Sequence, residues 1–128
     1  MRQHNQGFTL IELLVVVAII GIISAVGVVS YSGYKSSAEK KQAEITLNTI
    51  YLAEQEYKSN NGEYYFNTST SNLVTNLFDG VDDLSEQSYT FKTTNASSLT
   101  ITATKKTNTS CTISITEKNK KPNISSAC

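Results

Sequence analysis

Hydrophobic and polar positions divide this chain into three parts with different periods. Residues 13–34 carry no charge, and the first part of this run, LLVVVAIIGIISAVGVV, is almost wholly aliphatic. A run of this length spans a hydrocarbon core of about 30 Å as a helix. It follows a short polar start, MRQHNQG, in which Arg2 is the firm positive charge. The pattern therefore predicts an apolar N-terminal helix that inserts into a membrane.

The second part is amphipathic and has no proline before Asn60-Asn61-Gly62, whose composition predicts a helix stop. We therefore expect one helix from about Thr9 to about Asn60. Three- and four-residue spacing gives it a wider apolar stripe of Ala43, Leu47, Ile50, Tyr51 and Tyr57, and a narrower stripe of Ala38, Ile45 and Leu52 on nearly the opposite side. The wider stripe is expected to seat a sheet of the same chain. The narrower stripe has two interpretations, a contact with other subunits or scattered apolar residues on a solvated face.

Strict alternation of apolar and polar residues begins after Gln87 and predicts three strands, SYTFKT, SLTITAT and CTISIT. Their apolar members share one face: Tyr89, Phe91, Leu99, Ile101, Ala103, Cys111, Ile113 and Ile115. The amphipathic helix is the segment long and apolar enough to cover that face. The predicted fold class is α+β, with one long N-terminal helix packed on a three- to four-stranded antiparallel sheet.

The segments between these elements carry weaker signals. Residues 61–87 show no sustained period and are interpreted as a loop, with one short helical turn near Ser71–Leu77 and an optional fourth strand at 63–67. Pro122 argues against a regular strand in the C-terminal tail. The acidic residues of the loop match no calcium-binding spacing, so we interpret them as a solvated turn and expect no metal site: Asp79, Asp82, Asp83 and Glu86.

Composition limits the partners and the compartment. Eleven basic and eleven acidic residues cancel, so net charge gives no reason to expect an obligatory anionic partner. Cys111 and Cys128 both lie near the C-terminus, and after an export-like segment such a pair favours one disulfide in an oxidising compartment. Two unpaired buried thiols are the alternative if this region stays in the cytoplasm.

The stretch GFTLIELLVVVAIIGIISA resembles the N-terminus of type IV pilins, in their type IVa-like form, and of the related pseudopilins of type II secretion. The resemblance implies that a prepilin peptidase removes leader 1–7 by cutting after Gly7 and that Phe8 becomes the N-methylated first residue. It further implies a membrane or fibre-core half at 8–34 and a globular head at 35–128. Where the family pattern often has proline, this chain has Val29, which puts the curvature of the helix in doubt.

Within the head, the expected order is an amphipathic helix at 35–60, the loop at 61–87, the sheet at 88–116 and a disulfide-bounded C-terminal loop at 111–128. Such a loop is a usual feature of type IV pilins, so it favours a pilin over a pseudopilin. The resemblance implies a structural subunit that leaves the bacterial inner membrane, with the assembly machinery there as partner, for an extracellular pilus fibre used in adhesion, twitching motility or DNA uptake. A minor pilin or a pseudopilin is the alternative within the family.

Glu12 is the residue that an ordinary membrane anchor would not carry. An acidic side chain at the centre of a membrane helix costs roughly 2.5 to 3.5 kcal/mol. The resemblance implies that the Glu12 carboxylate meets the N-terminal amine of a neighbouring subunit in the fibre core. A secretory signal peptide cleaved near SAVG at 24–27 is the competing interpretation, but it leaves Glu12 unexplained.

Catalytic chemistry is not expected. The single histidine, His4, lies in the leader, and the chain has no phosphate-binding glycine loop and no G-x-S-x-G motif. We therefore predict no enzyme activity and no cofactor. A rival role is a surface module that binds DNA or another polyanion through five lysines of the last quarter: Lys105, Lys106, Lys118, Lys120 and Lys121. The same lysines could simply keep turns and strand edges soluble, and their own stretch holds no aromatic residues.

Overall fold

The computed structural model describes residues 7–81, 84–95 and 98–128. The chain forms two compact units, one ending at Ser37 and the other beginning at Ala38, and each is considered by itself. Leader residues 1–6 and the acidic residues Asp82 and Asp83 lie outside the described part of the chain.

The helix α1 runs from Leu10 to Asn61 without interruption, so the single long helix expected from the sequence is confirmed. Gly62 ends it with a φ of 85°, and its N–H donates to the carbonyl of Lys58 at 2.8 Å. This left-handed cap is the role for which glycine after a helix is suited. The apolar first part of α1 has the length and composition of a membrane-crossing helix.

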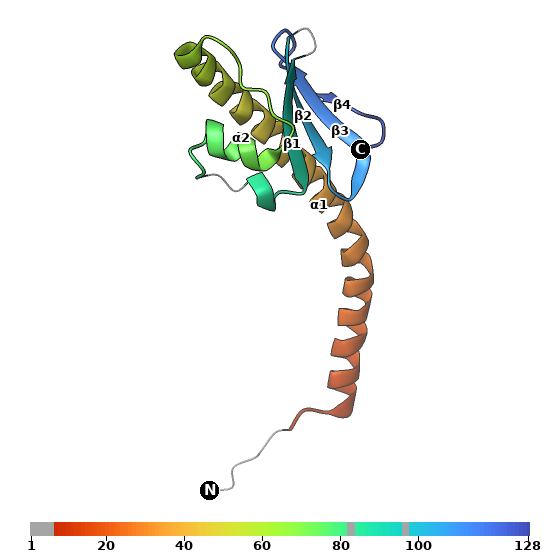
Figure 1. The fold of residues 1–128 in the computed structure, drawn as a ribbon. Coiled ribbons are helices and arrows are strands. Elements are labelled where there is room, and N and C mark those ends of the chain that lie inside the picture. The colour runs from red at the N-terminus through yellow and green to blue at the C-terminus, as the bar shows by residue number, and fades with distance from the viewer. Residues whose placement is uncertain (1–6, 82–83, 96–97) are drawn as a thin grey trace, which may run out of the picture. The chain divides into compact units, whose positions relative to one another are not determined.

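The head carries one sheet of four strands in the order β1-β2-β3-β4, with antiparallel neighbours throughout. Its strands are β1 (Tyr89–Asn95), β2 (Leu99–Lys105), β3 (Asn108–Thr116) and β4 (Asn123–Ile124). Figure 1 shows these strands lying across the second half of α1, with the short helix α2 (Thr70–Leu77) beside β1. The 3₁₀ turn η1 (Leu84–Glu86) lies between α2 and the first strand. The predicted α+β class and three-strand meander are confirmed.

The core lies between α1 and the inward face of the sheet. All eight sheet residues predicted to share one face are buried, and Ala43, Leu47 and Ile50 of the wider helix stripe meet them. Leu73 of α2 and Leu84 of η1 complete this core. The narrower stripe is exposed, with Ile45 at 53% and Leu52 at 67%. The division of α1 into a core-facing stripe and an outward-facing stripe is therefore confirmed.

The fourth strand is not where the sequence suggested. Residues 63–67 contain no strand, because the β1 backbone makes only one bond with them, from the N–H of Thr93 to the carbonyl of Asn67 at 2.8 Å. The fourth strand is instead β4, which pairs with Ile113 and Ser114 of β3. It begins directly after Pro122, where proline removes no ladder donor. Pro122 was expected to argue against a further regular strand in the tail, and this expectation was wrong for the two-residue strand β4.

Side chains close the outer edge of β1. The Thr70 hydroxyl accepts from the N–H of Phe91 at 2.8 Å and donates to the carbonyl of the same residue at 3.1 Å. Thr93 adds its own hydroxyl, which accepts from the N–H of Asn67 and donates to the carbonyl of Tyr65. The loop before α2 therefore satisfies polar groups along this edge without forming a ladder.

Glu54 lies in the head, on the part of α1 that faces the core, and its side chain is fully buried. Its Oε2 accepts from the N–H of Tyr65 at 2.9 Å, which ties the loop to the helix. Its other oxygen, Oε1, has no hydrogen-bond partner within the described residues. Burial raises the pKa of Glu54 to about 7, and the bond from Tyr65 opposes this only in part.

We predict that the head loses stability as pH rises, because of Glu54. Its pKa is about 7 in the folded chain against 4.5 for the free group. The folded state therefore holds its proton more tightly, and the contribution is complete below pH 4.5 and is lost as pH rises through 7. The shift corresponds to about 3 kcal/mol. Glu54→Gln should flatten the pH dependence of thermal unfolding between pH 4.5 and 8, measured by circular dichroism in nonionic detergent. An unchanged slope in this variant, with Glu44→Gln as the control, would contradict the assignment.

Candidate functional site

The first turn of α1 is closed by a reciprocal pair of side chains. The Thr9 hydroxyl accepts from the N–H of Glu12 at 3.3 Å, and the Glu12 carboxylate accepts from the N–H of Thr9 at 2.8 Å. The same carboxylate oxygen accepts from the Thr9 hydroxyl at 2.6 Å. This is a capping box, and its signal, Thr9 followed three residues later by Glu12, was present in the sequence but not used.

The capping box gives Glu12 a partner within its own chain. The carboxylate is exposed and can still take a cation, since a carboxylate has lone pairs beyond those used by Thr9. Gly7 and Phe8 precede the helix and are exposed, with Phe8 at 94%. The peptide bond between them is therefore in non-helical, accessible chain, which is the state that a peptidase requires.

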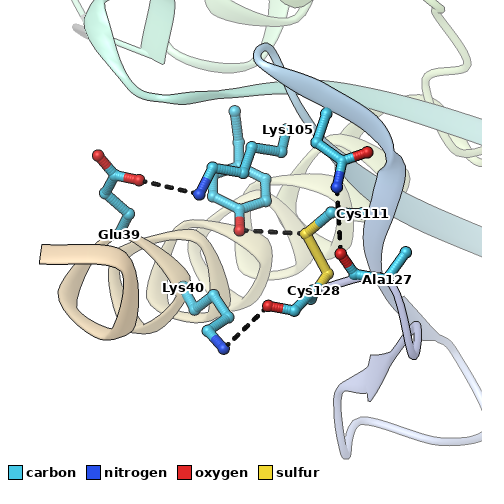
Figure 2. A network of polar contacts seen from close by, with 8 residues as sticks. Glu39, Lys40, Lys105, Cys111, Ala127 and Cys128 are labelled. Atoms are coloured by element: carbon cyan, nitrogen blue, oxygen red, sulfur yellow. Dashed lines mark hydrogen bonds and ion pairs between the residues drawn. A yellow bond between two sulfur atoms is a disulfide. The ribbon is translucent and has the colours of Figure 1, made fainter. Parts of the chain in front are cut away.

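A disulfide ties the C-terminal loop to β3 at Cys111, which lies on the buried face of the sheet. Cys111 and Cys128 are bonded, with their Cα atoms 4.6 Å apart, so the pairing expected from the sequence is confirmed and the alternative of free thiols is excluded. Figure 2 shows further ties to the same loop: Lys40 of α1 donates to the carbonyl of Cys128 at 3.3 Å, and Asn108 donates to that of Ala127 at 3.2 Å. The loop is thus fixed to both the helix and the sheet.

The buried side of this disulfide contacts Tyr89. The Tyr89 hydroxyl lies 3.5 Å from Sγ of Cys111 and donates to it, because a disulfide sulfur carries no proton. Burial raises the pKa of the Tyr89 hydroxyl, which keeps this donor protonated. Nearby, Lys105 of β2 pairs with Glu39 of α1 at 3.3 Å (Figure 2). These contacts link the start of the head's helix to the base of the sheet.

The five lysines of the predicted polyanion patch do not form one group. Lys105 and Lys106 precede β3, whereas Lys118, Lys120 and Lys121 follow its end at Thr116. The strand between them is roughly 25 to 30 Å long. Lys105 is also neutralised by Glu39, and Lys106 donates to the carbonyl of Ser85 at 2.7 Å.

Two aromatic rings lie under lysines at the far end of the sheet, a feature that sequence reasoning missed. Nζ of Lys120 is 4.9 Å from the ring centroid of Tyr51, and Nζ of Lys58 is 4.2 Å from that of Tyr64. Both distances are within the range of cation–π attraction. Tyr51 and Lys120 are far apart in sequence, and Lys58 and Tyr64 are separated by the end of α1, so the periodicity of the helix could not have indicated either pair.

Within the described ranges, no three His, Cys, Asp or Glu side chains gather where they could hold a metal ion. Asp79 and Glu86 are described, but the proposed acidic turn that contains them is interrupted by the undescribed pair between them.

The described residues combine an apolar helix, capped by Thr9 and Glu12, with an α+β head and a disulfide-bounded loop. Residues 2–28 match the family described as "Prokaryotic N-terminal methylation motif". The chain is 36% identical over 75 residues to a fimbrial protein of Neisseria meningitidis serogroup B, which covers 59% of this chain and 44% of that relative. It is 37% identical over 61 residues to the type IV major pilin protein PilA of Myxococcus xanthus, covering 48% of this chain and 28% of the relative.

The chain is also 33% identical over 63 residues to type II secretion system core protein G of Klebsiella michiganensis, which covers 49% of this chain and 44% of that protein. It thus spans less than half the length of each of these relatives. No solved structure matches it significantly. The chain is thus similar, through its N-terminal motif and over about half of its length, to fimbrial and type IV major pilin proteins and to a core protein of type II secretion.

We predict that Cys111→Ala with Cys128→Ala lowers the free energy of unfolding by about 3 kcal/mol, because the bond closes a loop with a sequence separation of 17. The freed tail should then become sensitive to trypsin after Lys118 and Lys120. Limited proteolysis followed by mass spectrometry measures this, and Ser126→Ala is a control that leaves the bond in place. Equal digestion of the variant and the parent chain would contradict the anchoring role of the bond.

Proposed function

We propose that this chain is a structural subunit of a type IV pilus, held in the inner membrane as a precursor and polymerised through its N-terminal helix into a surface fibre. The observation that carries the proposal is the exposed apolar first part of α1, headed by the Glu12 carboxylate and matched by the methylation motif. The fibre's use in adhesion, twitching motility or DNA uptake is part of the proposal.

The physical need for partners follows from the exposure of this helix. Large apolar side chains from Phe8 to Val28 are between about half and almost fully exposed in the single chain. Full removal of each such side chain from water stabilises the buried arrangement by roughly 1.5 to 3 kcal/mol. Lipid in the precursor and the helices of other copies, or of other pilins, in the fibre are the two environments that provide this.

Glu12 gives the helix its register in the proposed fibre. A charge in an apolar core requires a charged and hydrogen-bonded partner, and removal of one member of a buried pair costs about 3 to 5 kcal/mol. The N-terminal amine of Phe8 in a neighbouring copy is a suitable partner once the leader has gone. Prepilin peptidase and its methyltransferase activity would act at Gly7 and Phe8, and the inner-membrane assembly machinery would extract the product.

A minor pilin or a secretion pseudopilin is the second candidate. Protein G of type II secretion is among the relatives and supports it, whereas the two pilin relatives and the disulfide-bounded loop support a pilus subunit. Abundance in sheared surface fibres separates a major subunit from a minor one. A chain that stays in the membrane fraction while secretion depends on it would favour the pseudopilin.

The first prediction from this proposal concerns processing. The protein from native membranes should begin at Phe8, carry one additional methyl group and have two hydrogens fewer for the disulfide, as measured by intact mass and N-terminal sequencing. Gly7→Asp should block cleavage because its side chain is larger and charged. Gly7→Ala, which adds only a methyl group, is the control and should affect cleavage less. A mature chain that begins near Val28 would overturn the proposal in favour of a secretory signal.

The second prediction concerns assembly. Glu12→Ala should insert in the membrane and be cleaved, yet give no fibres, because the intersubunit charge pair is lost. Glu12→Gln should behave in the same way while it keeps an acceptor for the N–H of Thr9, which separates charge pairing from helix capping. Thr9→Ser is the matched control that retains the hydroxyl cap. Fibres are counted in sheared fractions and by electron microscopy, and normal fibres from Glu12→Gln would remove the charge pair from the proposal.

A further inference from the structure

The end of the apolar run carries two tyrosines that the fold of the head does not use. Tyr31 and Tyr34 are 69% and 75% exposed. Of the seven tyrosines, all of which lie in the described part of the chain, only these two are exposed. The other five pack against the core, a lysine or another ring of the head. Both exposed tyrosines belong to the compact unit that ends at Ser37, so the packing of the head does not explain them.

The residues around these tyrosines have the composition of a membrane–water boundary. Residues 30–37 read SYSGYKSS, so serine, glycine and Lys35 are the only other residue types there. Lys35 is exposed and lies on the same side of α1, because it follows Tyr31 by four residues and Tyr34 follows Tyr31 by three. Tyrosine is enriched at membrane interfaces, since its ring is apolar and its hydroxyl needs a polar partner. We call Tyr31, Tyr34 and Lys35 the interfacial cluster.

The two charges that bracket the apolar run determine its depth in a membrane. No charged residue lies between Glu12 and Lys35, and α1 is continuous between them. Lys35 follows Glu12 by 23 residues, which correspond to about 35 Å of helix, against about 30 Å for the hydrocarbon core. Both charges therefore lie outside the hydrocarbon only when the run is centred. A shift of one turn, about 5.4 Å, takes one of them into the hydrocarbon.

We propose that the interfacial cluster binds phospholipid headgroups at one face of the membrane and thereby holds Glu12 at the headgroups of the opposite face. This assignment rests on the membrane-held precursor of the proposed function. The tyrosine hydroxyls donate to ester and phosphate oxygens of the lipids, and the ammonium of Lys35 pairs with phosphate while its alkyl stem lies along apolar surface. The capped, exposed carboxylate of Glu12 meets water and headgroups on the other side. In the precursor, Glu12 thus avoids the membrane centre, where a charge costs most.

Lipid headgroups fit the interfacial cluster better than a second copy of the same helix. The two rings stand among serines and a glycine, so this segment offers no continuous apolar stripe to another helix. Parallel copies in a membrane lie at the same depth, so their Lys35 side chains would meet and repel each other. Lipid phosphates instead supply the opposite charge at that depth.

The test uses the full chain in phosphatidylcholine vesicles, with single tryptophans as depth probes, because the chain has no tryptophan of its own. Fluorescence is quenched by lipids brominated near the carbonyl end, in the middle or near the methyl end of their acyl chains. Tyr34→Trp keeps an aromatic ring with a polar tip and should be quenched most by the shallow bromines. Val26→Trp, at an exposed position eight residues earlier, is the matched probe and should lie roughly 11 to 12 Å deeper.

The depth of Glu12 is tested with Leu13→Trp, at the exposed position beside it. This probe should be quenched most by the shallow bromines, as at the other face. Tyr31→Leu with Tyr34→Leu lengthens the apolar run, so the segment should move toward the Leu13 end by up to about one helical turn. Leu13→Trp should then lose quenching. Val28→Leu exchanges one exposed apolar side chain for another and is the control that should leave the depth unchanged.

Circular dichroism establishes that each variant keeps its helix. The inference is overturned if Tyr34→Trp is quenched most by the deep bromines, or escapes quenching while Val26→Trp is quenched. It is also overturned if Leu13→Trp reports a deep position, or if the double leucine variant leaves that probe at its original depth. If Val26→Trp itself escapes quenching, the chain does not enter the bilayer, and the membrane step of the proposed function is overturned together with this inference.

Discussion

The head depends on the contact between one stripe of α1 and the inner face of the sheet. Ala43, Leu47 and Ile50 supply the helix side of this contact, and alternate residues of three strands supply the other. Neither partner is stable alone, since a solvated helix is marginal and a small sheet needs a cover for its apolar face. The remaining contacts of the head, such as Lys40 with Cys128 and Glu39 with Lys105, add polar ties to an arrangement that the helix–sheet contact determines.

One helix serves two environments, and its side chains show where the change occurs. Up to Ser37 the helix has exposed apolar residues and forms its own unit, whereas from Ala38 onward it shares a unit with the sheet. Glu12 belongs to the first environment and Glu54 to the second. Both are carboxylates that need a partner, but Glu12 has the Thr9 cap and open surroundings, while one buried oxygen of Glu54 has no partner among the described residues. The same side-chain chemistry therefore has opposite consequences at the two ends of α1.

Much of the fold could be predicted because periodicity is local. Alternation in the strands identified every buried apolar residue of the sheet but not the buried Thr93, and the spacing of Ala43, Leu47 and Ile50 identified the core side of α1. The fourth strand could not be found this way, because two residues after Pro122 contain no period and pair only when the disulfide holds the tail beside β3. The lysine–tyrosine contacts were missed for the same reason, since Tyr51 and Lys120 come together only in the folded head. The Thr9–Glu12 cap is different, because its spacing was present in the sequence and required only recognition.

Thr70, which lies at the edge of β1, affects how closely the heads of different chains can approach one another. By using one hydroxyl to satisfy both backbone groups of Phe91, Thr70 leaves this residue nothing to offer a strand from another molecule. In the proposed fibre, many heads would be held beside one another at an effective concentration far above that of free protein. An open strand edge under those conditions would act as a template for cross-β growth. Thr70 therefore allows heads to lie close together without β1 of one chain pairing with a strand of another.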